Sequence, residues 1–476
     1  MTCWKDLLSP YLMGTGGLAV RDPANGELVA AVADHGPREV EAAIAAAEAA
    51  QPEWAERPAK ARAAILRDWH DLILAHAEAL AQLATLESGK PLAESRGEVG
   101  YAASFIEWFA EQAKRVNGEI LPSPWPGKRV LVHKQPVGVT AAITPWNFPL
   151  AMITRKAGPA LGAGCAMLVK PAEATPLSAL ALERLAHRAG VPEAVFRVLP
   201  SSAAAAVGSV LCASPVIRKL SFTGSTAVGK VLMQQAAATV TRLSLELGGS
   251  APFIVFEDAD IDAAVAGALA SKYRNAGQTC VCANRFLVHH AAERAFVDRL
   301  AAAVNAMTMG HGLAPGTQIG PLIDRRAVEN VHALVADALA AGATLAAGRE
   351  WQADDGSFHP PVVLTGVTPH MRIAREEIFG PVAAIIRFAD EAEAVAIAND
   401  TPYGLAAYVY TRDPARTWRL MDRLECGMIG FNEGIISTEI APFGGIKESG
   451  LGREGSHHGI EEYLEMKYCL LGGMER

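Results

Sequence analysis

The sequence is poor in cysteine, with 7 among 476 residues and no regular disulfide spacing. Such sparse use is typical of the reducing cytosol rather than of disulfide-stabilised secreted proteins. No apolar run of about 18 or more uncharged residues is present, so we expect no membrane-spanning helix. The opening residues, MTCWKDLLSP, lack the basic segment and apolar run of a secretory signal. We therefore expect a cytoplasmic protein.

Metal-binding patterns and excess positive charge are also missing. There is no CxxC, HExxH or EF-hand loop, and the pairs His289–His290 and His457–His458 lack further ligands at a suitable spacing. We therefore predict no metal site. The formal net charge of -8 argues against nucleic acid or anionic membranes as partners. A small anionic substrate would need locally placed arginine or lysine.

What is present is a long chain of ordinary globular composition. Half of its residues are hydrophobic and a fifth are charged, and its length predicts two or three domains. Residues 38–117 have helical periodicity. From residue 166 to 246, short apolar segments alternate with helical segments, which predicts right-handed βαβ units, a parallel sheet and ligands at the carboxyl ends of its strands. A second α/β segment runs from about residue 250 to 447, and the final residues favour an exposed strand that would invite pairing with another subunit.

Two motifs on the first predicted sheet suit a dinucleotide. In FTGSTAVG, Gly224 permits a sharp turn and Ser225 begins a helix, where free N–H groups favour an anion. The glycines are five apart, so this motif alone favours a plain strand–helix turn. In VKPAEATP, Lys170 and Glu173 end another strand and suit the two hydroxyls of a ribose, although a solvated pair opening a helix is the alternative. Together the motifs favour a dinucleotide.

Three other residues are candidates for chemistry. Glu246, in LELGG, ends a strand among leucines, and an apolar setting raises a carboxyl pKa toward that of a useful base, unless the charge is simply exposed. Asn147, in TPWNFP, is an amide that can donate to an oxyanion or merely form a turn. Cys280, in RNAGQTCVCANR, is a candidate nucleophile, although most lone cysteines are buried and inert.

Taken together, these motifs resemble those of the aldehyde dehydrogenase superfamily. PWNFP, VKPAE, FTGS, LELGG, GQTC, EEIFGP and PFGGIKESGLGREG follow the family's order over nearly the whole chain. RNAGQTCVCANR, MITRK and NEGIIS are similar to the succinate-semialdehyde dehydrogenase branch, and glutarate-semialdehyde dehydrogenases are hard to separate from it. The resemblance implies an NAD- or NADP-dependent oxidoreductase.

The resemblance also implies a fold. It comprises a Rossmann-like dinucleotide-binding domain (1–116 and 137–248), an α/β catalytic domain (249–447) and a small β oligomerisation flap (117–136 and 460–476). Homodimers or homotetramers are usual in the family.

The resemblance assigns roles residue by residue. Cys280 is the nucleophile, Glu246 the general base, and Asn147 with the Cys280 backbone N–H the oxyanion hole. Arg155, Arg274 and Ser437 face the substrate carboxylate, with an ordinary surface residue as the alternative for either arginine. Cys282 is a candidate redox partner of Cys280, or a small packed side chain. The implied cofactor-binding residues are Thr144, Trp146, Lys170, Glu173, Gly224, Ser225, Gly229, Glu377 and Phe379.

Several alternatives stay open. Glutarate semialdehyde is one methylene longer, a difference worth only about 1 to 3 kcal/mol in a pocket. A CoA-acylating enzyme usually lacks glutamate at the position of Glu246, and a non-catalytic protein would not need Cys280, Glu246 and Asn147 together. We expect NAD to be preferred, because a carboxylate at Glu173 repels a 2′-phosphate, whereas Lys170 could pair with one.

Overall fold

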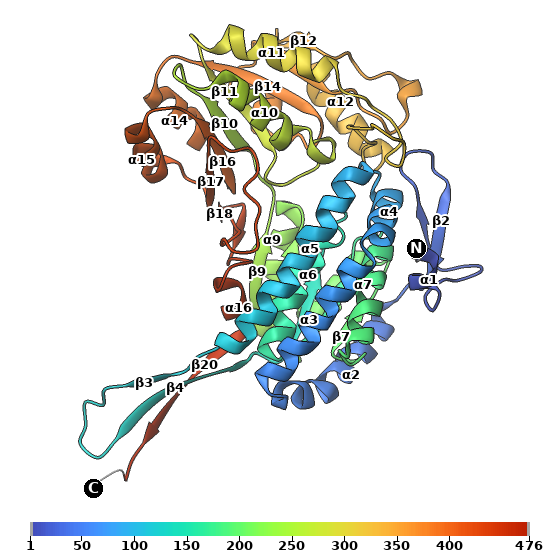
Figure 1. The fold of residues 1–476 in the computed structure, drawn as a ribbon, viewed down its shortest axis with the longest axis vertical. Helices are drawn as coiled ribbons and strands as arrows, with labels where there is room; N and C mark the ends of the chain where they lie inside the picture. The colour runs from blue at the N-terminus through green and yellow to red at the C-terminus, as the bar shows by residue number, and fades with distance from the viewer. Residues whose placement is uncertain (1–2, 474–476) are drawn as a thin grey trace.

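The computed structural model describes residues 3–473, which form two sheet-centred lobes and a projecting arm (Figure 1). The first lobe contains a six-stranded sheet of order β19-β9-β8-β5-β6-β7. All its neighbouring strands are parallel except the edge pair β19–β9. The strands are β5 (Val139–Ile143), β6 (Ala166–Lys170), β7 (Phe196–Val198), β8 (Ile217–Thr223), β9 (Arg242–Glu246) and β19 (Gly450–Leu451).

Helix boundaries in this lobe follow local chemistry. Proline occupies the first turn of α7 (Pro176–Ala189), where its missing N–H does no harm, and Gly190 ends the helix in a left-handed conformation. The helices that link the strands are α6 (Ala151–Ala163), α7, α8 (Ala204–Ala213) and α9 (Thr226–Ala236). The predicted N-terminal helices are α2 (Pro37–Glu56), α3 (Ala59–Ala75), α4 (Ala77–Ser88) and α5 (Leu92–Gln112), of which α5 packs on α3 and α6.

The second lobe is built on a seven-stranded sheet of order β12-β13-β14-β11-β10-β16-β17, parallel except for the β12–β13 pair. Its strands are β10 (Ala251–Val255), β11 (Ala283–His289), β12 (Thr344–Ala347), β13 (Val362–Thr365), β14 (Val382–Phe388), β16 (Ala406–Tyr410) and β17 (Met428–Phe431). Its main helices are α10 (Ile261–Lys272), α11 (Glu293–Asn305), α12 (Arg325–Ala340), α14 (Glu391–Asn399) and α15 (Pro414–Arg423). Each lobe has its own hydrophobic core, so the α/β class expected from the alternating pattern is confirmed.

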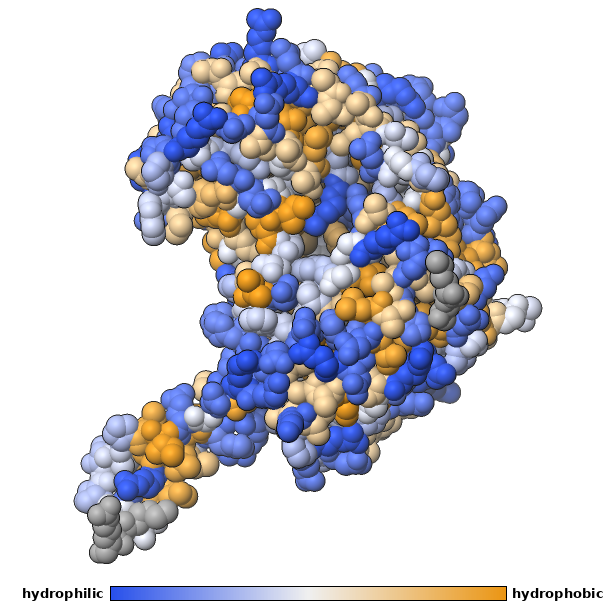
Figure 2. All heavy atoms as spheres, in the orientation of Figure 1, coloured by the Kyte–Doolittle hydropathy of each residue, from blue (hydrophilic) through white to orange (hydrophobic). Residues whose placement is uncertain are grey.

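The arm is a three-stranded antiparallel sheet of order β20-β4-β3 that projects from the first lobe (Figure 1). Its strands are β3 (Glu119–Leu121), β4 (Arg129–Pro136) and β20 (Leu464–Leu471), which pair from Leu464↔Pro136 to Leu471↔Arg129. Figure 2 shows hydrophobic surface on it, and Ile120 and Met466 are more than two-thirds exposed. Between residues 3 and 473, no helix combines the length and apolar character needed to cross a membrane.

Candidate active site

A cavity of about 250 Å³ lies at the carboxyl ends of β8 and β9, where ligands bind in parallel sheets. It contains all three residues expected to do chemistry, Cys280, Glu246 and Asn147. Cys280 comes from the second lobe and the other two from the first, so the structure brings together motifs that are far apart in sequence. The other lining residues are Pro145, Trp146, Phe148, Met152, Thr223, Gly224, Ser225, Leu247, Gly248, Glu377 and Phe379.

Cys280 is half-buried and follows a short 3-10 turn, η3 (Arg274–Gly277). Burial raises the pKa of its thiol to about 12, since a thiolate loses solvation there. Arg155 opposes this shift, while Glu246 and Glu377 add to it. The thiol is therefore protonated near neutral pH until a base or an added positive charge assists it.

Glu246 ends β9 and is only 2% exposed, which excludes the alternative of a solvent-exposed charge. Burial, together with repulsion from Glu454, raises its pKa well above the usual value, although Arg155 and Lys156 act in the opposite direction. Its buried Oε2 has no hydrogen-bond partner among the described residues. An unpaired buried carboxyl oxygen beside a thiol suits a group that accepts a proton from water.

Asn147 is 6% exposed and lies in the turn between β5 and α6. Its side-chain amide donates to the backbone carbonyl of Gln278 at 3.0 Å, and the backbone carbonyl of Asn147 accepts from Lys90 Nζ at 2.6 Å. One amide N–H therefore fixes the side chain against the cysteine loop. The other is left to donate to an oxyanion in the cavity.

A buried charge cluster of Glu454, Arg155 and Lys156 affects Glu246, and the sequence motifs did not predict it. Glu454 contacts Arg155 Nε at 2.5 Å and Lys156 Nζ at 2.5 Å, and Lys156 also donates to Thr223 Oγ1 at 2.6 Å. Burial raises the pKa of Glu454, but Lys156 and Arg155 outweigh it and hold the value to about 2. Glu454 is contained in the quoted segment GLGREG, but no spacing rule links it to Lys156, which is 298 residues away.

Of the residues expected to face the substrate carboxylate, Arg155 is 1% exposed, so it is not an ordinary surface arginine. Its Nη1 is buried without a partner among the described residues, and its guanidinium lies 4.2 Å from the Phe443 ring. The Arg274 guanidinium is 5.3 Å from the ring of Phe148, which lines the cavity. Neither arginine is itself a lining residue of the cavity as described, and neither is half-buried Ser437.

The residues expected to hold a dinucleotide fit that group. Lys170 Nζ lies 2.5 Å from Glu173 Oε1 at the end of β6. The two hydroxyls of a ribose could therefore bind an ammonium and a carboxylate at this position. Ser225 is the exposed N-cap residue of α9, and backbone N–H groups at a helix N-terminus favour a phosphate. Gly224 has no room for a side chain, because an added Cβ would lie 2.5 Å from the ring of Phe222.

Gly229 is needed for a similar reason, since a Cβ there would lie 2.5 Å from Leu247. Thr144 is buried, and its N–H donates to the carbonyl of Lys170 at 3.1 Å. These contacts bring the end of β5, the end of β6 and the start of α9 to one edge of the sheet. That edge is where the sequence motifs place the cofactor.

The nicotinamide end of the expected site is formed mainly by the second lobe. Glu377 Oε1 accepts from the N–H of Gly249 at 3.1 Å, and burial raises its pKa to about 7. Trp146 and Phe379 meet edge-on with ring centroids 5.7 Å apart. Asn284, which the motif analysis missed, accepts from the Ile378 N–H at 3.0 Å and so anchors the segment that carries Glu377.

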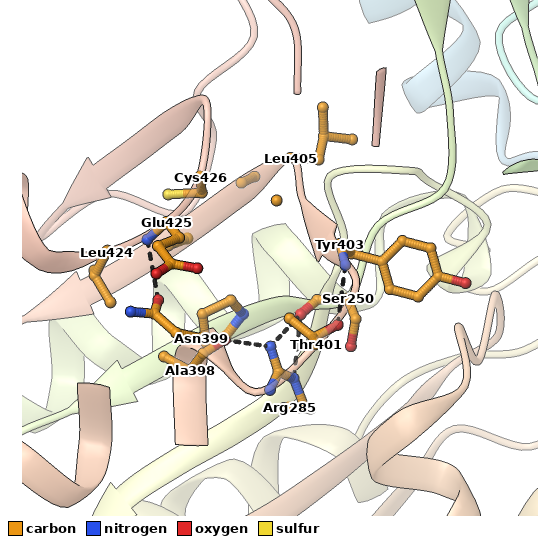
Figure 3. Close-up of a pocket in the computed structure, with 14 residues that line it drawn as sticks. Ser250, Arg285, Ala398, Asn399, Thr401, Tyr403, Leu405, Leu424, Glu425 and Cys426 are labelled. Carbon is orange, nitrogen blue, oxygen red and sulfur yellow. Dashed lines mark hydrogen bonds between the residues drawn. The ribbon is translucent and has the colours of Figure 1, made fainter. Parts of the chain in front are cut away.

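A much smaller cavity of about 10 Å³ lies in the second lobe, next to the start of β10 (Figure 3). Arg285 donates there to the carbonyls of Ser250, Ile397 and Ala398, at 2.7 to 3.2 Å. Burial lowers the pKa of this arginine to about 10. With space for about one water molecule, the cavity is a structural junction rather than a substrate site.

Cys282 is 6% exposed, and its thiol donates to the carbonyl of Lys272 at 3.5 Å. Its pKa is raised by burial. The side chain is therefore packed away from solvent beside the nucleophile. A bond to Cys280 would require it to leave this position.

Comparison with known proteins agrees with this geometry. Residues 13–469 match the model of the aldehyde dehydrogenase family. The chain is 56% identical to the NADP-dependent succinate-semialdehyde dehydrogenase of Escherichia coli, covering 95% of this chain and 94% of that protein. It is 55% identical to the glutarate-semialdehyde dehydrogenase of Pseudomonas aeruginosa, covering 96% and 94%. A crystal structure of succinate-semialdehyde dehydrogenase from Burkholderia pseudomallei superposes with a TM-score of 0.94 at 57% identity, covering 96% and 95%.

Proposed function

The chain belongs to the aldehyde dehydrogenase family, and from that premise we propose that it oxidises succinate semialdehyde to succinate with NAD or NADP. The observation that carries the proposal is the joint placement of Cys280, Glu246 and Asn147 around one cavity. A thiol, a partner-free carboxyl oxygen and a spare amide donor are the three groups that aldehyde oxidation through a thioester requires.

In the proposed reaction the Cys280 sulfur, once deprotonated, attacks the aldehyde carbon and forms a thiohemiacetal. The negative oxygen of that adduct accepts from the free N–H of Asn147 and from the backbone N–H of Cys280. Removing one donor of this kind typically slows a reaction by about 10² to 10³-fold. The fixed position of Asn147 against Gln278 means that this donor needs no reorganisation.

Loss of a hydride converts the thiohemiacetal to a thioester, and a bound nicotinamide supplies the hydride acceptor. Glu246 then takes a proton from a water molecule, whose oxygen attacks the thioester carbon. The carboxylic acid leaves and the Cys280 sulfur is released. The charge cluster of Glu454, Arg155 and Lys156 lies close enough to affect the pKa of Glu246 and so to tune this base.

The substrate assignment rests on charge at the site. The unpartnered Nη1 of Arg155, and Arg274 above Phe148, offer guanidinium donors to a distal carboxylate, and Ser437 would add a hydroxyl. Each charge-assisted bond is worth about 1.5 to 3 kcal/mol. Two such bonds would favour an anionic aldehyde over a neutral one by about 10² to 10⁴-fold.

For the cofactor, we expect NAD to be preferred over NADP. The carboxylate of Glu173 lies beside the expected ribose position and repels a 2′-phosphate, while its ion pair with Lys170 partly neutralises that lysine. The similar Escherichia coli enzyme is named for NADP, so the ratio of kcat/KM for the two cofactors tests this expectation directly. A higher value with NADP would mean that Lys170 dominates.

The decisive assay measures NADH or NADPH formation with succinate semialdehyde, glutarate semialdehyde and a neutral aldehyde, each with and without CoA. We expect the highest kcat/KM with succinate semialdehyde and no acceleration by CoA. A higher value with glutarate semialdehyde would assign the five-carbon substrate. Dependence on CoA would indicate acyl transfer to a thiol, and no turnover of any aldehyde would contradict an enzymatic role.

We further propose that the arm (β3, β4 and β20) joins copies of this chain into a homodimer or homotetramer. Its exposed apolar residues support this, because a monomer rarely displays such a group on a projecting strand. The β20 edge that faces away from β4 has unpaired backbone groups that another strand can complete.

A further inference from the structure

The turn ahead of Cys280 has an unusual backbone. Asn275, Ala276 and Gly277 are consecutive left-handed residues, with φ of 51°, 52° and 77°. Only glycine adopts this conformation without steric cost, so surrounding contacts must hold Asn275 and Ala276 in place. The same turn begins with Arg274, one of the expected carboxylate-binding residues.

Glu94, in the first turn of α5, supplies one of these contacts. The backbone N–H of Asn275 donates to Glu94 Oε2 at 2.7 Å. The Asn275 side-chain amide donates to the carbonyls of Asn147 and Gln278, at 3.1 and 3.2 Å. The backbone of Asn275 thus binds the strained turn to Glu94 in the first lobe, and the Asn275 side chain binds it to the loop that carries Asn147.

The groups that face Glu94 are Lys90, Arg274 and Glu98. Burial raises the pKa of Glu94 to about 7, while the N–H of Asn275, Lys90 and Arg274 act to lower it. Lys90 is already engaged, because it pairs with Glu98 and donates to the carbonyl of Asn147 at 2.6 Å. Arg274 is the cation without such a partner, and its buried Nε has none among the described residues.

We propose that Glu94 is a positioning residue for substrate specificity: by accepting the Asn275 N–H, it fixes the left-handed turn and so directs Arg274 toward the substrate carboxylate. This inference rests on the proposed oxidation of an anionic semialdehyde. Its particular claim is that Glu94 acts as a hydrogen-bond acceptor. A negative charge so close to Arg274 would by itself weaken the binding of an anion.

The test compares two uncharged side chains of similar size, Glu94→Gln and Glu94→Met. Glutamine keeps an acceptor oxygen for the Asn275 N–H, whereas methionine does not. With glutamine, we expect the KM for succinate semialdehyde to equal or fall below that of the wild type. With methionine, we expect it to rise about tenfold, the effect of one lost hydrogen bond, while the KM for propanal changes less than about threefold. Glu107→Gln, on the exposed face of the same helix, is the matched control and should leave both KM values unchanged.

Three results would overturn the inference. The first is a methionine variant whose KM for succinate semialdehyde stays within twofold of the wild type. The second is an equal rise for both aldehydes, which indicates a merely structural role. The third is a glutamine variant as impaired as the methionine variant, which assigns the effect to charge. If Glu94→Met does not give folded protein, Glu94→Ala replaces it. A wild-type enzyme that does not prefer anionic aldehydes contradicts the proposed function itself, and this is seen before any variant is made.

Discussion

Among single residues, the nucleophile and the base share one property: burial raises the pKa of both Cys280 and Glu246. Burial raises the pKa of the Cys280 thiol to about 12, so the thiol is protonated at pH 7. The resting thiol is therefore protected from most electrophiles, and its reactivity depends on what enters the cavity. This gives a measurable pH dependence.

We predict that alkylation of Cys280 by iodoacetamide, without substrate or cofactor, accelerates about tenfold for each pH unit between pH 7 and 9. The reason is the sign of the shift: below a raised pKa, the thiolate fraction is still growing with pH. Mass spectrometry of the Cys280 peptide gives the rate, and an unstructured cysteine-containing peptide, whose thiol has an ordinary pKa near 8.5, is the reference. A plateau below pH 9 would contradict the raised pKa.

Replacing Glu246 by glutamine should separate the two halves of the reaction. Glutamine has nearly the same shape but cannot accept a proton from water, so the thioester should form and then persist. We expect a burst of about one NADH per active site followed by turnover slowed about 10² to 10⁴-fold. Stopped-flow absorbance measures both phases. A linear trace at the wild-type rate would remove Glu246 from the role of base.

The buried position of Cys282 sets a condition for its proposed role as the redox partner of Cys280. A sulfenic acid on Cys280 could be captured by Cys282 only after its thiol leaves the carbonyl of Lys272. We expect peroxide to inactivate the wild type, dithiothreitol to restore activity, and Cys282→Ala to recover far less. Equal recovery of both proteins would leave Cys282 with a packing role alone.

Among the structural elements, the start of α6 depends on a carboxylate from α5. Glu98 accepts from the N–H groups of Leu150 and Ala151, at 2.8 and 3.2 Å, and pairs with buried Lys90. Because α6 begins just after Asn147, the same contacts support the oxyanion donor. A buried ion pair of the first lobe thus supports both the start of α6 and the turn that carries Asn147.

We predict that Glu98→Ala destabilises the protein by about 3 to 5 kcal/mol, since it leaves Lys90 buried without its partner. Differential scanning calorimetry should show a clearly lower Tm. Glu78→Ala removes a carboxylate whose ion pair with Arg96 is largely exposed, so its Tm should change little. Similar Tm values for the two variants would contradict the importance of the buried pair.

The regular elements were largely predictable, because alternation of apolar strands with helical stretches is visible locally. The segment AMLVK is β6, and TPLSALALERLAHRAG contains α7 with its proline start and glycine end. The contacts around the site were not predictable in the same way. Glu94 with Asn275, and Glu454 with Lys156, are 181 and 298 residues apart, and no periodicity pairs residues over such distances.

On the scale of the whole molecule, the arm is the place where we propose that copies of the chain associate. We predict that Ile120→Glu combined with Met466→Glu produces a smaller species in light scattering coupled to size-exclusion chromatography, because both side chains are exposed on the arm. Leu28→Glu, an exposed leucine on β2 (Leu28–Val32), is the control and should keep the wild-type mass. An unchanged mass in the double variant would place the interface elsewhere.

Because Glu454 lies near the end of the sequence, its buried ion pair with Lys156 can form only late in synthesis. During synthesis, Lys156 leaves the ribosome 298 residues before the carboxylate that neutralises it, an interval of about 15 to 60 seconds at about 5 to 20 residues per second. Until then, the nascent first lobe would carry two cations destined for burial without their counter-ion. Strand β20 follows still later and completes the arm. A chain that terminates before residue 454 therefore lacks both the carboxylate that pairs with Lys156 and the strand that completes the arm.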